Sequence, residues 1–541
     1  MNKPSFKKIL GVSSTSVASA AFIIGFLSIA SRLLGVVRDR ILASSFGAGQ
    51  TLDLYYAAFR LPDLVFNLLV LGALSAGFIP IFTKLLHNEE NPRAHWDLAN
   101  NVFNSLFFGL LIICGLGILL APWLVEIIAP GFPQSVHGEI VLLTQIMFLS
   151  PFFIGLSSIA GSILQSFQRF LIYSLAPVLY NVGIIIGALY FAPHWGIFGL
   201  AWGVVLGSIM HFTIQLPLLF KLGFRYQWLF NWRDKALRTM YSMMTARTLG
   251  LAITQINLIV TTMIASTLAE GSLAVFNLAN NLQSFPVGIF GISFAVAVFP
   301  LLSSVADELF IERFSKTFRQ IIFCIVPATV ALIILRAQIV RVILGAGKFN
   351  WEDTIHTIDA VGFFALSLFA QATVPLLARA FYAKHDSKTP FYIGLISAVV
   401  NVALSLIWAH NLGVAGLALA FSASTIVNFL LLFVLLRRRV GRLDEKRIII
   451  SLAKCSAAGI SMALVIQAMK LLIWPYLDMT RLWGILLQGS LAGIFGLIVY
   501  FAVCSLLKSE EFNELWQATK IKLFASAKKL KAEDQSEVQG L

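Results

Sequence analysis

The sequence predicts an all-α polytopic membrane protein with about fourteen transmembrane helices. Of its 541 residues, 58% are apolar and only 12% are charged. The mean hydropathy is +0.85, and apolar blocks long enough to cross a hydrocarbon core of roughly 30 Å recur along the whole chain. We expect the spans to begin near residues 16, 51, 97, 139, 170, 196, 237, 272, 315, 355, 389, 413, 448 and 481.

The first span follows a basic leader, MNKPSFKK, and a stretch of small residues, which together imitate a signal peptide. Because many more apolar spans follow, we expect an uncleaved first helix. The four cysteines, Cys114, Cys324, Cys455 and Cys504, all fall in apolar spans without metal-ligand spacing. They are expected to be packing residues, so no metal or cofactor is predicted.

Charged side chains interrupt the first two spans, in the segments SRLLGVVRDRILASSFGAG and TLDLYYAAFRLPDL. They are Arg32, Arg38, Asp39, Arg40, Asp53, Arg60 and Asp63. A charge at mid-bilayer costs at least ~2.5 kcal/mol on insertion scales, so such residues usually face a protein interior or a watery cavity. A functional site is therefore expected there.

In the first span, Arg32 lies roughly 18 Å from the cytoplasmic end, close to the middle of the bilayer. Arg32 and Asp39 are seven residues apart and share a helix face, whereas Arg38 points about 120° away from Arg32 on a straight helix. A bend at Gly35 would be needed to bring all three together.

In the second span, Asp53, Arg60 and Asn67 recur at seven-residue spacing and share one face. Pro62 and Gly72 are available to break this helix, and transporters use broken helices at membrane depth to line a binding site.

Two interpretations of these charges compete. In one, the arginines pair with Asp39, Asp53 and Asp63 and clamp the first helix to the second. In the other they form an anion site in a cavity, because the planar guanidinium grips phosphate with two hydrogen bonds and keeps its charge.

Later spans add weaker candidates. Arg247 in the seventh span either brings a cation from the second half of the chain or extends to the cytoplasmic surface. Asn277, Asn281 and Ser284 form a polar stripe on the eighth span, either a cavity wall or a hydrogen-bonded helix seam. His211 is interpreted as a satisfied interior histidine, with a proton relay as the alternative.

The two halves of the chain match at an offset of about 220 residues. GIFGLAWG at Gly196 corresponds to GVAGLALA at Gly413, and Pro80 corresponds to Pro300. Asn181 likewise corresponds to Asn401. We predict two pseudo-symmetric six-helix lobes, residues 1–225 and 226–443, with two extra helices in 444–507 and a basic amphipathic tail in 508–541.

The net charge of +14 is spread over alternate short loops. By the positive-inside rule this places both termini in the cytoplasm. A nucleic-acid partner is excluded, because the basic residues form no single patch. The sequence also contains no HExxH, G-x-S-x-G or P-loop motif, so an enzyme is not expected.

With these residues in view, the chain resembles the MurJ (MviN) family of lipid II flippases, within the superfamily that includes drug exporters. Besides the two charged segments, the resemblance rests on GALSAGFIPIF, APGF, ITQINLIVTTMIAS, SFPVGIFG and LARAFYAKHDSKTP. It implies a MATE-like (MOP) fold in the cytoplasmic (inner) membrane. It also implies outward transport, by alternating access, of the undecaprenyl-pyrophosphate-linked peptidoglycan precursor for cell wall biosynthesis.

The resemblance carries Arg32, Arg38, Asp39 and Asp53 over as substrate-site residues. The chain departs from the family where Phe66 and Leu71 replace a basic and an acidic residue. It departs again where Asn281 and Ser284 replace an arginine and a glutamate. Either Arg60 or Arg247 then compensates, or the head group differs.

Three functions remain open at this point: a lipid II flippase, a flippase for another polyprenyl-pyrophosphate-linked glycan, and a membrane-embedded transferase or non-transporting scaffold. The expected partners are the lipid-linked glycan, membrane lipids and a coupling ion or the membrane potential. The chain is expected to act as a monomer.

Overall fold

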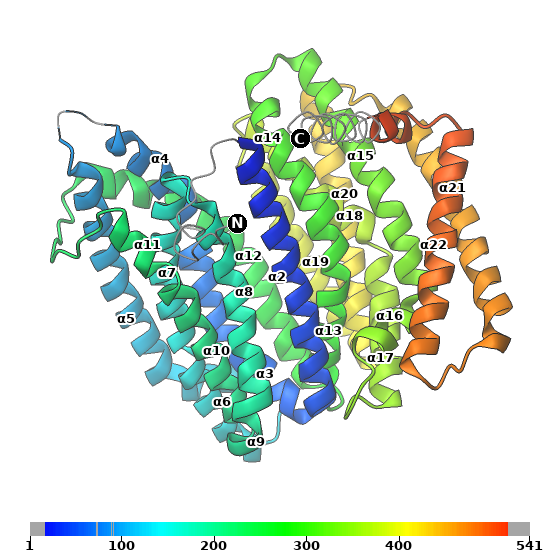
Figure 1. The fold of residues 1–541 in the computed structure, drawn as a ribbon, viewed down its shortest axis with the longest axis horizontal. Coiled ribbons are helices and arrows are strands. Elements are labelled where there is room, and N and C mark those ends of the chain that lie inside the picture. Colours follow the sequence, from blue (N-terminus) through cyan, green and yellow to red (C-terminus); the bar gives the residue numbers. More distant parts are fainter. Residues whose placement is uncertain (1–16, 72–73, 88, 90, 518–541) are drawn as a thin grey trace, which may run out of the picture. The chain divides into compact units, whose positions relative to one another are not determined.

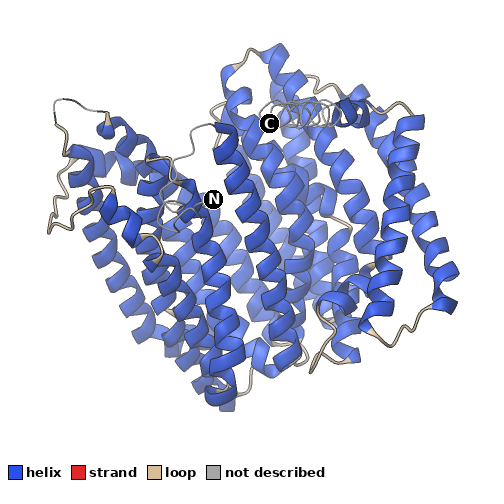
Figure 2. Cartoon of the chain, in the orientation of Figure 1, coloured by secondary structure: helices blue, strands red, loops and turns tan. Residues whose placement is uncertain are grey.

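The computed structural model describes residues 17–71, 74–87, 89 and 91–517. Side chains are described within these ranges, except at residues 17–22, 69–76 and 244–250. All regular elements of the described ranges are helices, and Figure 2 draws no strand among them. This confirms the predicted all-α class.

The helices follow one another along the chain as labelled in Figure 1. They are α2 (Val17–Phe46), α3 (Gln50–Val65), η1 (Phe66–Leu71), α4 (Leu74–Leu86), α5 (Ala94–Ile128), α6 (Gln134–Met147), α7 (Leu149–Ser166), α8 (Phe170–Ile186), η2 (Gly187–Phe191), α9 (Ala192–Trp195), α10 (Ile197–Thr213), α11 (Leu216–Lys221), α12 (Lys235–Ser266), α13 (Ser272–Pro286), η3 (Val287–Ile292), α14 (Ser293–Ser304), α15 (Asp307–Ile334), α16 (Arg336–Ile343), α17 (Trp351–Ala365), α18 (Leu368–Ala383), α19 (Lys388–Leu412), α20 (Val414–Val440), α21 (Glu445–Ile473), η4 (Trp474–Tyr476) and α22 (Leu482–Leu506).

Most predicted spans begin within about five residues of the start of one of these helices, but the ninth, expected near residue 315, begins earlier, at Asp307 of α15. Within the described residues, ten helical segments are long and apolar enough to cross a membrane, and an eleventh results if α17 and α18, bent by 46°, are taken together. The three remaining predicted spans start at α2, α3 and α12. Each of these three helices contains intramembrane charges or side chains that are not described. They therefore fall outside the count of long apolar helices.

Proline marks a change of helix type in both halves of the chain. Pro62 lies in α3 four residues before the π-helical turn η1, and Pro286 ends α13 directly before the π-helical turn η3. Proline has no backbone N–H, so it removes one hydrogen bond of the α-helical ladder. The predicted break near Pro62 therefore occurs as a π-turn, while Gly72 lies outside the described residues.

Other positions also share local structure between the halves. Gly196 and Gly413 both have positive φ angles, +57° and +59°, directly before α10 and α20. A side chain is strained in this backbone region, which explains glycine at both matched sites. These similarities agree with the internal repeat, and the lobe boundaries stay a prediction.

By residue contacts the chain forms two compact units, described here separately. The first contains residues 1–282, 343–360 and 394–421, and the second contains 283–342, 361–393 and 422–541.

In the first unit, small residues set the crossing of α8 and η2 with α10 (Figure 1). A Cβ atom on Gly183 would overlap the backbone of Gly207, and one on Gly187 would overlap Gly203. Helices in a membrane associate closely where small residues let their backbones touch. This crossing fixes the positions of Asn181 on α8 and of the residues at the end of α10.

Three buried asparagines on α5 hold the chain that precedes α12. The Nδ2 of Asn104 donates to the backbone oxygens of Gln227 and Leu229, at 2.9 and 2.8 Å. Asn100 and Asn101 bind the same segment through further backbone groups. Residues 225–231 are not in regular secondary structure, and the asparagine side chains satisfy backbone groups that would otherwise have no partner in a helix or strand.

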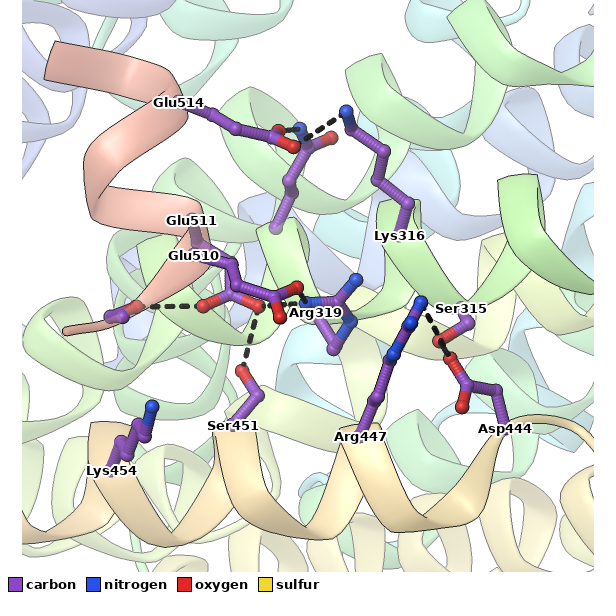
Figure 3. Close-up of polar contacts among 12 residues, drawn as sticks. Ser315, Lys316, Arg319, Asp444, Arg447, Ser451, Lys454, Glu510, Glu511 and Glu514 are labelled. Carbon is purple, nitrogen blue, oxygen red and sulfur yellow. Dashed lines mark hydrogen bonds and ion pairs between the residues drawn. The ribbon is translucent and has the colours of Figure 1, made fainter. Parts of the chain in front are cut away.

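In the second unit, α15 is tied to α21 and to the helical residues 510–517 by a polar cluster, drawn in Figure 3. The guanidinium of Arg319 contacts Glu511 at 2.6 Å and Glu510 at 2.7 Å, and Ser451 donates to Glu511 at 3.0 Å. The Arg319 and Glu511 side chains are 9% and 4% exposed, so their charges neutralise each other in a largely dry setting. The predicted amphipathic tail beyond residue 517 lies outside the described residues.

Candidate functional site

The centre of the candidate site is the adjacent pair Arg38 and Asp39 on α2. The Nε and Nη2 atoms of Arg38 both donate to Oδ1 of Asp39, at 3.0 and 2.8 Å. Neighbouring residues on a helix do not normally face each other. Here the arginine folds back along the helix surface, so its fork closes on the next carboxylate.

Two asparagines from distant parts of the chain complete this pair. Nη1 of Arg38 donates to Oδ1 of Asn181 on α8 at 3.1 Å, and Nδ2 of Asn281 on α13 donates to Oδ2 of Asp39 at 2.9 Å. The carboxylate is 7% exposed and the arginine side chain 23%. Asp39 is thus satisfied on both oxygens, while part of the arginine remains accessible.

A second intramembrane arginine is held only by neutral groups. Nε of Arg60 donates to Oγ1 of Thr262 on α12 at 2.7 Å, and Nη2 donates to Oδ1 of Asn277 on α13 at 2.6 Å. Among the described residues, no carboxylate forms an ion pair with Arg60 within 4.0 Å. Its positive charge is therefore fixed in position without a directly bonded counter-ion, and Asp63, one turn later on α3, is the acid that interacts with it. This arrangement suits an anion site.

Asp53 has a different setting from the other charges. Its two carboxylate oxygens accept the backbone N–H groups of Gly271 and Ala274, each at 2.7 Å. This caps the first turn of α13, where unpaired N–H groups favour a negative charge. Asp53 is 2% exposed and forms no hydrogen bond or ion pair with the described side chains of Arg38 and Arg60, so any influence on substrate would pass through the position of α13.

Of the remaining predicted residues, Arg32 and Asn67 do not take part in these contacts. Arg32 is exposed on α2 and forms no hydrogen bond or ion pair with any described residue, and α2 runs unbroken through Gly35. Asn67 donates to the backbone oxygen of Asp63 in its own helix, at 2.9 Å. Ser284 is half-buried on α13. The side chain of Arg247 on α12 lies outside the described part of the chain.

Next to Arg38, the first unit encloses a cavity of about 430 Å³. Its walls come from α2, α3, η1, α7, α8, α10 and the residues just after α10. The lining side chains are Arg38, Phe59, Pro62, Asp63, Phe66, Ser150, Pro151, Ile154, Ser157, Ser158, Gly161, Ser162, Gln165, Tyr173, Pro177, Tyr180, His211 and Gln215. The accessible wall is therefore mainly apolar, and its polar groups are hydroxyls, amides, the His211 imidazole, one guanidinium and one carboxylate.

His211 is part of this wall. Its Nδ1 atom and the Oγ of Ser157 are 2.7 Å apart, and Ser157 also donates to the backbone oxygen of His211 at 2.9 Å. The histidine thus has the interior partner that the first interpretation of the sequence predicted.

Sequence reasoning missed Asn181, Asp63 and Gln215 as site residues. Asn181 had one available signal, because an amide in the apolar span YNVGII requires a partner. Asp63 was noted only as a possible ion-pair partner, and Gln215 gave no signal, since it lies near the end of its span.

Comparison with known proteins identifies the family. A Vibrio cholerae protein described as a probable lipid II flippase MurJ is 29% identical over 515 residues, covering 91% of this chain and 97% of that protein. The lipid II flippase MurJ of Burkholderia cenocepacia is 30% identical over 421 residues, covering 76% of this chain and 81% of its own length.

Solved structures support the fold. A lipid II flippase MurJ in an inward closed conformation superposes with a TM-score of 0.74 at 24% identity, over 90% of this chain and 98% of that one. An inward-facing multidrug resistance transporter of the MATE family and MOP superfamily gives a TM-score of 0.63 at 17% identity, over 79% and 99% of the two chains. The family model described as lipid II flippase MurJ matches residues 42–486, well over half of the sequence, and this chain therefore belongs to that family.

Proposed function

We propose that this protein is a lipid II flippase of the cytoplasmic membrane, which moves the undecaprenyl-pyrophosphate-linked muropeptide from the inner to the outer leaflet. Membership of the family supports the class of cargo. The observation that carries the proposal is Arg38, a membrane-embedded guanidinium that lines a cavity and stays partly accessible. A buried arginine of this kind fits a phosphate group better than any neutral ligand.

The contacts of Arg38 suggest how cargo binding changes the conformation. A pyrophosphate that binds the guanidinium of Arg38 competes with Asp39 for the same N–H groups. Asp39 in turn accepts from Asn281, which belongs to the second predicted lobe. A ligand shifts a conformational equilibrium only through different interactions with its states, and displacement of Asp39 supplies such a difference.

Arg60 supplies the second cation in this proposal. It contacts Asn277, in the part of α13 that belongs to the second predicted lobe. Arg60 therefore compensates for the neutral Asn281, and in this proposal the chain acts as a monomer. Both termini face the cytoplasm in this topology.

The test is rescue of a bacterial strain depleted of its own lipid II flippase. The wild-type chain should restore growth and cell shape, and native mass spectrometry should detect one lipid II molecule per monomer. Failure to rescue despite normal membrane insertion, together with a bound lipid that carries a different glycan, would assign the chain to the alternative flippase for another polyprenyl-pyrophosphate glycan. That alternative is favoured by one specific observation, the neutral Phe66 and Asn281 at positions where the family is usually basic.

A further inference from the structure

The cavity beside Arg38 contains a second charged group for which the proposed site has no use. Asp63 lies on α3, half-buried, and lines the same cavity of about 430 Å³. Its charge interacts with that of Arg60, one turn earlier on α3, and its side chain is hydrogen-bonded by Asn67, but within the described residues it forms no ion pair within 4.0 Å. Intramembrane carboxylates usually pair or serve a ligand, so this group calls for an explanation.

The cavity also contains an unpartnered acceptor. Gln215 is only 1% exposed, and its amide nitrogen is fixed by Ser157 at 2.5 Å and by the backbone oxygen of His211 at 3.1 Å. The carbonyl oxygen of the same amide accepts no hydrogen bond from the part of the chain that the structure describes. A buried acceptor without a donor is costly, but this oxygen is enclosed with the rest of its side chain, so a ligand would reach it only after the cavity wall adjusts.

These groups give the cavity a polarity. Arg38 offers only donors, whereas an ionised Asp63 carboxylate offers only acceptors. The cavity wall also contains hydroxyl groups, such as those of Ser158 and Ser162, which can donate or accept. The cavity therefore matches a ligand that has an anion, a cation that donates hydrogen bonds, and hydroxyl or amide groups.

We infer that Asp63 binds a protonated primary amine on the head group of the transported lipid, while Arg38 binds its pyrophosphate. This inference rests on the proposed function and names the chemistry of the cargo. An ammonium group has three donors and no acceptor, which suits a carboxylate that only accepts. A cavity of a few hundred cubic ångströms is of the size that encloses a small organic moiety rather than a bare ion.

The experiment uses the full chain in lipid nanodiscs and two forms of lipid II, one with a free amine on its peptide and one with that amine acetylated. Acetylation removes the charge and two donors while the pyrophosphate stays intact. We expect the wild type to bind the free amine form roughly ten- to a hundredfold more tightly, as for one lost charge-assisted hydrogen bond.

In Asp63→Asn this preference should disappear, while affinity for the acetylated form stays within about twofold of wild type. Asp63→Glu, which keeps the carboxylate, should retain a preference even if the Asn variant folds poorly. Glu139→Gln, a neutralised exposed acid on α6 away from the cavity, is the matched control and should behave as wild type.

Equal binding of the two lipid forms by the wild type would overturn the inference while leaving the flippase proposal intact. Equal weakening of both forms in Asp63→Asn would also overturn it, and would assign the carboxylate to packing or to a small cation such as Na⁺. Binding of neither form by the wild type would refute the inference and the proposed function together.

Discussion

Replacing Arg38 with alanine separates the structural from the functional role of this arginine, provided that it is compared with a partner change at Asp39. In the wild type, Arg38 gives Asp39 two hydrogen bonds, at 3.0 and 2.8 Å. Arg38→Ala leaves the carboxylate, only 7% exposed, with the single donor Asn281. An uncompensated buried charge of this kind destabilises a protein by about 3 kcal/mol.

Adding Asp39→Asn removes that charge. The new amide can still accept from Asn281 through its oxygen, so the double variant should return to within about 1 kcal/mol of wild-type stability. If Arg38 also binds pyrophosphate, the double variant remains unable to transport. Recovery of stability without recovery of function is the expected signature.

Stability is measured by thermal unfolding in detergent, and transport by growth rescue of the depleted strain at matched membrane levels. Arg38→Lys is the third variant, because it keeps the charge but loses the planar fork, and should give partial rescue at most. Full growth with the double Arg38→Ala/Asp39→Asn variant would refute the reasoning, since it would show that the pair only clamps α2 in place.

Three further outcomes follow from the contacts. Asp53→Ala removes both caps of α13 and should cost about 1 to 2 kcal/mol in thermal unfolding; no change would mean that water replaces the carboxylate. Gly271→Ala should lower the yield of folded protein, because its φ is +86° and a Cβ would overlap a backbone oxygen, whereas Gly138→Ala, with open space around it, should be neutral. Arg319→Ala should cost about 3 kcal/mol through the buried charge left on Glu511. Burial alone would raise the pKa of Glu511, but hydrogen bonds and Arg319 outweigh it and hold the pKa below the ordinary 4.5. The stability that this carboxylate contributes is therefore complete above about pH 4.5 and is lost as the pH falls through the lower folded-state pKa. Arg319→Ala should flatten this part of the curve of stability against pH. An unchanged curve would contradict the role given to Arg319.

Local sequence was enough to predict the class of fold and the position of most spans. In lipid every backbone group must be satisfied within its own helix, so apolar length locates most of the helices. The same holds for the special positions Pro62, Gly196 and Gly413, whose effects on the backbone are properties of the residue itself. The sequence also located Arg38, Asp39 and Arg60 as candidates, because a charge inside an apolar span is expensive wherever the helix is placed.

Which of these charges meet which partners was decided by tertiary structure. Asn181 and Asn281 reach the Arg38 and Asp39 pair across 143 and 242 residues of chain, and Asp53 caps a helix rather than touching an arginine. Such contacts depend on the rotation and crossing of whole helices, which close packing sets at places like Gly183 against Gly207. A shift of one residue turns a helix by about 100°, so no local pattern could have placed Asp63 and the Gln215 oxygen around one cavity.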